Sequence, residues 1–153
     1  MTISPTIGFH FVKKISLRNR RLIKDTLKKL FRSEKSPLAE LQYIFVSDER
    51  LLEINRRFLG HDYYTDIVTF PLSEPGQPIV GEIYISVDRV RENAGTFKTP
   101  VHKELLRVMF HGALHLCSHA DKTNREQEKM RRLEDKYLRL HHLHLRAHVS
   151  RET

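Results

Sequence analysis

HGALHLCSHAD, residues 111–121, places three histidines and one aspartate within eleven residues. His111 and His115 are four residues apart, so an α-helix would stack them on one face, about one turn apart. Two imidazoles on one face can hold one metal ion, and Asp121 or its rival His119 would add a third ligand just past the helix. Three protein ligands with an open fourth position are the usual form of a catalytic zinc site.

Chance offers a second interpretation of this spacing. The chain contains ten histidines, so a helical pair can arise without a metal, and Ser118 and Asp121 would also suit a helix end. The residue after His111 is Gly112, so the HExxH pattern of zinc proteases, with glutamate as general base, is absent. Any metal chemistry at this stretch is therefore expected to differ from that of HExxH proteases.

The segments around residues 111–121 predict an α+β domain in the order β-α-β-α-β-β-α-α-α, with a mixed sheet of about four strands and about five helices. The polar turn SEPGQP predicts an antiparallel hairpin of the last two strands, and Thr123 with Glu126 forms a capping box that opens the last helix. We expect a single domain over residues 1–140 and a mobile tail over residues 141–153, whose histidines could bind metal adventitiously. The strands are expected near residues 7–12, Leu41–Val46, Thr65–Phe70 and Gly81–Val87.

Composition narrows the class of protein. The chain of 153 residues suits one domain, and it lacks both an apolar run long enough for a bilayer and a secretory signal pattern. A single cysteine fits the reducing cytoplasm. A net charge of +8 favours a polyanionic partner, most simply nucleic acid, although a solvated basic surface would give the same count.

Two basic clusters are candidates for contact with an RNA backbone. Arg20, Arg21 and Lys24 lie on the polar face of the first predicted helix, and Arg56 with Arg57 ends the second. Each cluster could equally be an ordinary solvated helix face, because exposed helices commonly carry such charges.

Three segments resemble one known family in the same order. HGALHLCSHAD is similar to the pattern HGxLHL followed by Gly, Tyr and a third ligand, while NRRFLGHDYYTDIVTFP and GEIYIS resemble the segments at the third and fourth strands. From about Phe9 to Leu140 the chain resembles the YbeY family of bacterial rRNA maturation factors, which are metal-dependent endoribonucleases. The resemblance implies a small mixed sheet packed by helices, with zinc at the end of the long helix.

The resemblance also implies a ligand set. His111 and His115 would be zinc ligands, and Asp121 stands where the family usually has a histidine. A carboxylate binds zinc at a similar distance, although it would make the site harder and more open to another divalent metal. His119 remains the rival third ligand, and Leu59 occupies the position of an arginine that the family usually carries near the cleft.

The function implied is hydrolysis of single-stranded RNA by a metal-activated water, in rRNA processing, ribosome maturation and quality control. Ribosomal RNA is the expected partner, with the ribosome or ribosomal proteins as further candidates. Glu82 is the candidate proton acceptor, or else a solvent-facing strand residue, and Asp66 is a candidate brace of the cleft. The alternative function is a non-catalytic RNA-binding ribosome-assembly factor with a structural metal.

Overall fold

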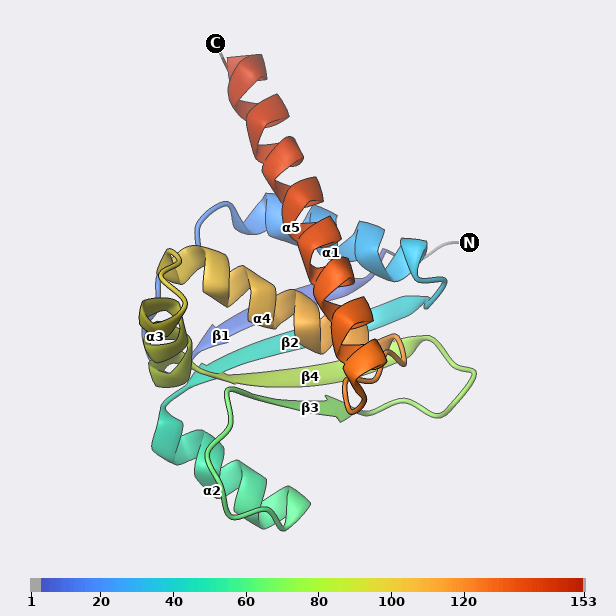
Figure 1. Cartoon of the computed structure of the whole chain (residues 1–153). Coiled ribbons are helices and arrows are strands. Elements are labelled where there is room, and N and C mark those ends of the chain that lie inside the picture. The colour runs from blue at the N-terminus through green and yellow to red at the C-terminus, as the bar shows by residue number, and fades with distance from the viewer. Residues whose placement is uncertain (1–3, 153) are drawn as a thin grey trace.

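The fold is a four-stranded mixed sheet covered by helices (Figure 1). The computed structural model describes residues 4–152, and the order of its elements confirms the predicted α+β fold. The strand order is β1-β2-β4-β3; β1, β2 and β4 are parallel, while β3 runs antiparallel to β4 and forms the predicted hairpin. The strands are β1 (Thr6–Phe11), β2 (Leu38–Val46), β3 (Ile67–Pro71) and β4 (Ile79–Ser86).

The helices divide between the two faces of the sheet. The larger core lies between the sheet and α4, α1 and α5, whereas a smaller cluster joins α2 to the opposite face (Figure 1). In β2, Leu41, Tyr43 and Phe45 point into the larger core, and Val46 points into the smaller one. This central strand is apolar on both sides because both of its faces are covered. The helices are α1 (Arg20–Ser33), α2 (Asp48–Leu59), α3 (Val87–Thr96), α4 (Val101–Leu116) and α5 (Asn124–Glu152).

The helix α4 approaches the sheet closely at Gly112. A Cβ atom at this position would lie 2.8 Å from Cδ1 of Ile67 and 3.0 Å from Cδ1 of Ile83. A side chain would therefore overlap the side chains of Ile67 on β3 and Ile83 on β4, which would have to shift. The absent side chain serves helix–sheet packing, and this packing fixes the height of the two flanking histidines above the sheet.

The last helix begins at the predicted capping box and is longer than expected. Thr123 Oγ1 accepts from the Glu126 backbone N–H at 3.1 Å, and Glu126 Oε1 accepts from the Thr123 N–H at 3.0 Å. Beyond residue 140, where we placed the end of the domain, α5 continues to Glu152 and buries His141, which is 2% exposed. Packing thus extends past the expected boundary, while mobility of the end stays a prediction, and residue 153 lies outside the described residues.

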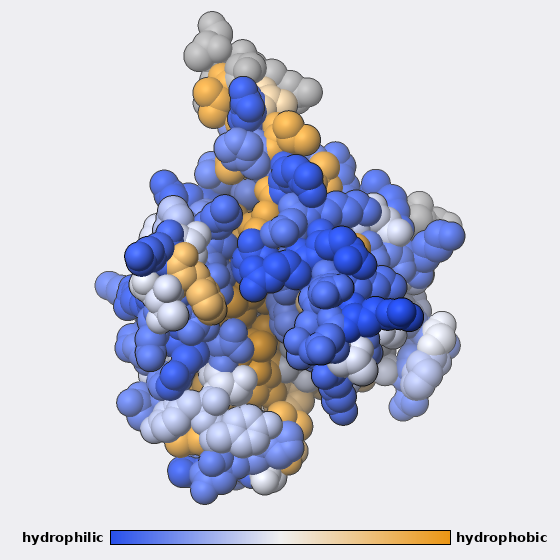
Figure 2. Space-filling model, in the orientation of Figure 1, coloured by the Kyte–Doolittle hydropathy of each residue, from blue (hydrophilic) through white to orange (hydrophobic). Residues whose placement is uncertain are grey.

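The surface is largely hydrophilic on the side where α5 lies (Figure 2). Exposed apolar side chains do occur on the outer part of α5, where Leu143 and Val149 face solvent. Within residues 4–152, no helix combines the length and the apolar character that crossing a bilayer requires.

Candidate metal centre

The turn that ends α4 brings Asp121 back toward the two histidines. The N–H of His119 donates to the Leu114 carbonyl at 3.1 Å, and the N–H of Ser118 donates to the His115 carbonyl at 3.0 Å. Ser118 adopts the left-handed conformation, with φ of 71°. These bonds form a Schellman motif, which reverses the chain direction after the helix.

Three donor atoms converge at this turn. The Nε2 atoms of His111 and His115 are 2.9 Å apart, and each lies 3.3 Å from Oδ2 of Asp121. Zinc bound tetrahedrally at about 2.0–2.1 Å from its ligands separates those ligands from one another by about 3.3 Å. Two imidazole nitrogens and one carboxylate oxygen at these separations fit a divalent metal in both geometry and chemistry.

A buried carboxylate on α5 contacts the ring nitrogen of His111 that is not part of the donor group. Nδ1–H of His111 donates to Oε2 of Glu134 at 2.7 Å, which leaves Nε2 as the lone-pair nitrogen of the group. Glu134, on α5, is 6% exposed and also accepts from Arg107 at 3.0 Å. Burial lowers the pKa of His111, but the hydrogen bond to Glu134 and the charges of Glu134, Asp121 and Asp66 outweigh it, so that this pKa is raised overall. The arrangement orients the imidazole in the way that metal-binding histidines usually require.

Two further carboxyl groups lie close enough to interact electrostatically with this cluster. Burial raises the pKa of Asp66, an effect that the charge of His111 partly opposes. Burial also raises the pKa of Glu104, which is 5% exposed in the first turn of α4. Both groups therefore take up protons more readily than ordinary carboxylates.

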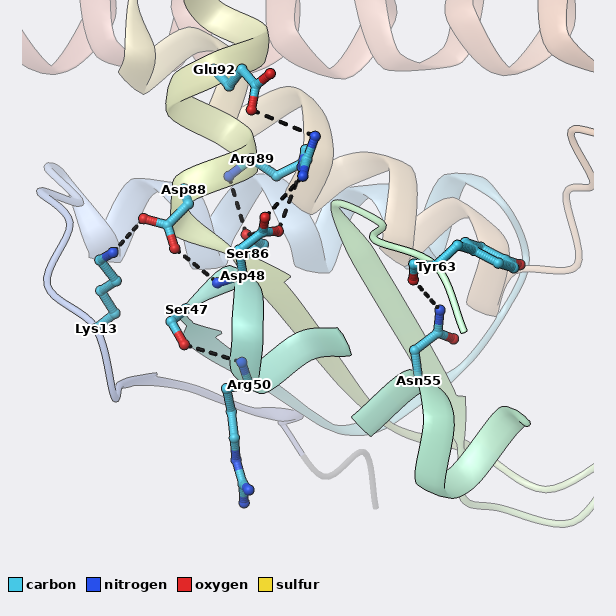
Figure 3. Close-up of polar contacts among 10 residues, drawn as sticks. All are labelled: Lys13, Ser47, Asp48, Arg50, Asn55, Tyr63, Ser86, Asp88, Arg89 and Glu92. Carbon is cyan, nitrogen blue, oxygen red and sulfur yellow. Dashed lines mark hydrogen bonds and ion pairs between the residues drawn. The ribbon is translucent and has the colours of Figure 1, made fainter. Parts of the chain in front are cut away.

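Contacts from α2 and α3 hold the loop that carries Asp66. Nδ2 of Asn55 donates to the Tyr63 carbonyl at 3.0 Å (Figure 3). The guanidinium of Arg89 lies 5.4 Å from the centre of the Tyr64 ring and donates to Asp48 at 2.8 Å, which links the start of α3 to the start of α2 (Figure 3). These contacts hold the loop just before Asp66, whose own carbonyl accepts from the Ser86 N–H at 2.9 Å.

The metal-ligand group opens into a cavity of about 510 Å³. One face of α5 forms its outer wall, with residues at positions 124, 127, 128, 131 and 134 following the spacing of a helix face. Arg107, nearby, is occupied by ion pairs with Glu134 and Asp135, whereas Arg131 makes no ion pair with any carboxylate among residues 4–152. The lining residues are His111, Asp121, Asn124, Gln127, Glu128, Met130, Arg131 and Glu134.

The structure does not bring His119 or Glu82 into this group. Nε2 of His119 contacts Oε1 of Glu34 at 2.7 Å, because the reversed chain after Ser118 directs this ring toward α1. Glu82 pairs with Phe70 across the hairpin and contacts the Tyr84 hydroxyl, on the face of the sheet away from α4. Asp121, rather than His119, is therefore the third residue of the group that could hold a metal ion, and Glu82 is separated from this group by the sheet.

The basic residues singled out from the sequence differ in their surroundings. The guanidinium of Arg20 lies 4.6 Å from the centre of the Phe11 ring, and the ammonium of Lys24 lies 5.7 Å from that of Phe9. Arg56 is paired with Asp62, and Arg57 lies over the ring of Phe58. None of Arg20, Arg21, Lys24, Arg56, Arg57 and Leu59 lines the cavity at the donor group.

Glu134, Arg107 and Arg131 are residues that the sequence analysis missed. Glu134 lies between Met130 and Tyr137 on the inward face of α5. A charged residue on an otherwise apolar, buried stripe was the signal in the sequence that could have indicated a functional role. Arg107 is one turn before His111 on α4, yet nothing local indicates that it meets α5.

Comparisons with known proteins agree with this architecture. The family model described as Endoribonuclease YbeY matches residues 10–142. A relative named Endoribonuclease YbeY from Cytophaga hutchinsonii is 51% identical over 78% of this chain and 83% of its own length. Another of that name, from Flavobacterium psychrophilum, is 42% identical over 90% of this chain and 97% of its own length.

A solved structure extends the comparison to three dimensions. The solution structure of TM1509 from Thermotoga maritima matches with a TM-score of 0.63 and 28% identity, covering 97% of this chain and 96% of that one. With the family model matching most of its length, the chain belongs to the endoribonuclease YbeY family.

Proposed function

We propose that this protein is a metal-dependent endoribonuclease that hydrolyses single-stranded RNA, with ribosomal RNA as its substrate during ribosome maturation. One observation carries the proposal: three donor atoms stand 2.9–3.3 Å apart at the mouth of a cavity, in a chain of the endoribonuclease YbeY family. The single cysteine and the family membership support a cytoplasmic location.

The metal we propose is zinc, held by Nε2 of His111, Nε2 of His115 and Oδ2 of Asp121. When bound there, a divalent metal supplies Lewis-acid polarisation of the phosphoryl oxygen and acidifies a water molecule. Two of the three separations, at 3.3 Å, match tetrahedral zinc, and the two histidine ligands suit it, while the carboxylate ligand leaves room for another divalent ion.

The surrounding residues would orient the substrate and handle its protons. Glu134 fixes the tautomer of His111, and Arg131 binds the phosphate of the RNA strand within the cavity. Asp66, whose pKa is raised by burial and which interacts electrostatically with His111, is a better candidate proton acceptor than Glu82, which faces the other side of the sheet. These roles replace the one that we expected for Glu82.

Outside the cavity, the basic face of α1 would hold the RNA backbone. Arg20, Arg21 and Lys24 make no ion pair with a carboxylate among the described residues, so their charges are available to phosphates. Arg56 is already paired with Asp62 and would contribute less. Single-stranded RNA suits such a surface because its backbone can follow an uneven path of cations.

A non-catalytic RNA-binding assembly factor is the second candidate, acting on the ribosome or its proteins. Leu59 favours it, because this side chain, 43% exposed, stands where the family usually carries an arginine. In this case the metal would be structural, and its removal would unfold the domain.

The experiment is cleavage of a labelled single-stranded RNA from the 3′ end of small-subunit rRNA, with and without a chelator. A His115→Ala variant purified in parallel reports contaminating nucleases, and His142→Ala, an exposed histidine of α5, is the matched control. We expect cleavage by the wild type and the control only, with the fold retained after chelation. Cleavage that persists in His115→Ala would come from a contaminating nuclease or from another site, and binding without cleavage would favour the assembly factor.

A further inference from the structure

We propose that a second cavity, between α1 and α5, is an anion site that binds a backbone phosphate of RNA, apart from the metal centre. This inference rests on RNA being the substrate. The cavity measures about 340 Å³ and shares no lining residue with the cavity at the metal-ligand group. Its walls are Leu22, Asp25, Lys28, Lys29 and Arg32 of α1, and His144, Ala147 and His148 of α5.

The charge of this cavity is unbalanced. Lys28, Lys29 and Arg32 face a single carboxylate, Asp25, and none of the three cations forms an ion pair within the part of the chain that the structure describes. Lys28 and Arg32 are four residues apart, a spacing at which like charges on a helix destabilise it. An anion placed between them would relieve this repulsion, and a phosphate has the charge and the acceptors to do so.

A hydrogen bond to His144 fixes the position of one of the three cations, Lys29. Nζ of Lys29 donates to Nε2 of His144 at 2.9 Å, and Nδ1–H of the same ring donates to Oγ1 of Thr26 at 3.3 Å. Burial and the charge of Lys29 lower the pKa of His144, which favours the neutral ring that can accept from the ammonium group. Only one of the three N–H groups of Lys29 is used in this contact, so two can donate to a ligand.

The cavity depends on residues beyond the stretch that the family model matches. The family match ends at residue 142, whereas His144, Ala147 and His148 lie beyond it on the continuation of α5. At 1.5 Å per residue, Ala147 is about 24 Å along α5 from Arg131 in the metal cavity. Only an RNA that spans this length can reach both sites, and binding at two connected sites strengthens the overall affinity.

The test compares two RNA lengths, about four and about sixteen nucleotides, because single strands occupy sites in this range. The cavity variant carries Lys28→Gln with Arg32→Gln, which removes two positive charges from the cavity. The matched control carries Lys98→Gln with Lys103→Gln, which removes two positive charges from positions that do not line the cavity. A charge-preserving variant, Lys28→Arg with Arg32→Lys, shows whether any loss comes from charge rather than from damage to the fold. Affinities are measured over a range of salt concentrations, with cleavage of the short RNA as a second readout.

Loss of two phosphate contacts makes the slope of log K against log salt concentration shallower by about 1.4. If the variant and the wild type bind equally at 1 M salt, the variant binds about 25-fold more weakly at 0.1 M salt. We expect this loss for the long RNA in the cavity variant alone, recovery in the charge-preserving variant, and unchanged cleavage of the short RNA. Equal binding by the cavity and control variants would overturn the phosphate site while leaving the proposed nuclease intact. Failure of the wild type to bind or cleave either RNA would overturn both.

Discussion

Replacing Glu134 by glutamine should weaken the metal site without disturbing the fold. Glu134→Gln keeps the shape of the side chain but removes the charge that accepts from Nδ1–H of His111 at 2.7 Å. Loss of such an outer partner lowers metal affinity by about 10- to 100-fold. A charge-assisted hydrogen bond of about 1.5–3 kcal/mol corresponds to about 13- to 160-fold in affinity, so the two estimates overlap.

The assay is competition for zinc against a chromogenic chelator, with thermal unfolding measured on the same samples. Asp135→Asn is the matched control: Asp135 also accepts from Arg107, at 2.9 Å, but makes no hydrogen bond or ion pair with His111. Wild-type affinity in Glu134→Gln would refute the positioning role. An equal loss in Asp135→Asn would show that the effect passes through Arg107 instead.

Four further changes test other parts of the structure. Arg131→Ala should lower kcat/KM for RNA by about 10- to 100-fold, the worth of one charge-assisted hydrogen bond, whereas Arg132→Ala, which does not line the cavity, should be nearly neutral in the same assay. Burial lowers the pKa of His141 to about 4, so the stability gained by keeping its ring neutral is complete above the unfolded pKa of 6.5 and is lost as the pH falls toward 4. The free energy of unfolding in urea should therefore fall between pH 6.5 and pH 4, and it should fall less in His141→Gln. Gly112→Ala should cost about 1–3 kcal/mol in urea unfolding because its methyl group would overlap the sheet. Ser118→Gly should raise the free energy of unfolding by about 1 kcal/mol, since φ is 71° at this residue, and an unchanged value would contradict the strain argument.

Local patterns predicted the elements, because hydrophobic periodicity and turn residues act over short distances. The hairpin around SEPGQP and the capping box at Thr123 are examples, and both occur as expected. The same patterns predicted that His111 and His115 share a helix face, and the structure brings their Nε2 atoms to 2.9 Å.

Contacts between distant segments were beyond these patterns. The bond between Glu134 and His111 joins α5 to α4, and the choice between Asp121 and His119 depends on the left-handed turn at Ser118. The position of Glu82 could have been predicted from the sequence. Side chains alternate along a strand, so Glu82 faces the other side of the sheet from its neighbour Ile83, which packs against α4.

The central claim is that His111, His115 and Asp121 hold a metal required for cleavage of RNA. Zinc is titrated into chelator-treated wild-type, Asp121→Ala and His119→Ala proteins while RNA cleavage and bound zinc are followed together. The geometry predicts one zinc per chain and restored cleavage in the wild type and in His119→Ala, and loss of both in Asp121→Ala. Restored cleavage in Asp121→Ala together with its loss in His119→Ala would contradict the proposed ligand set.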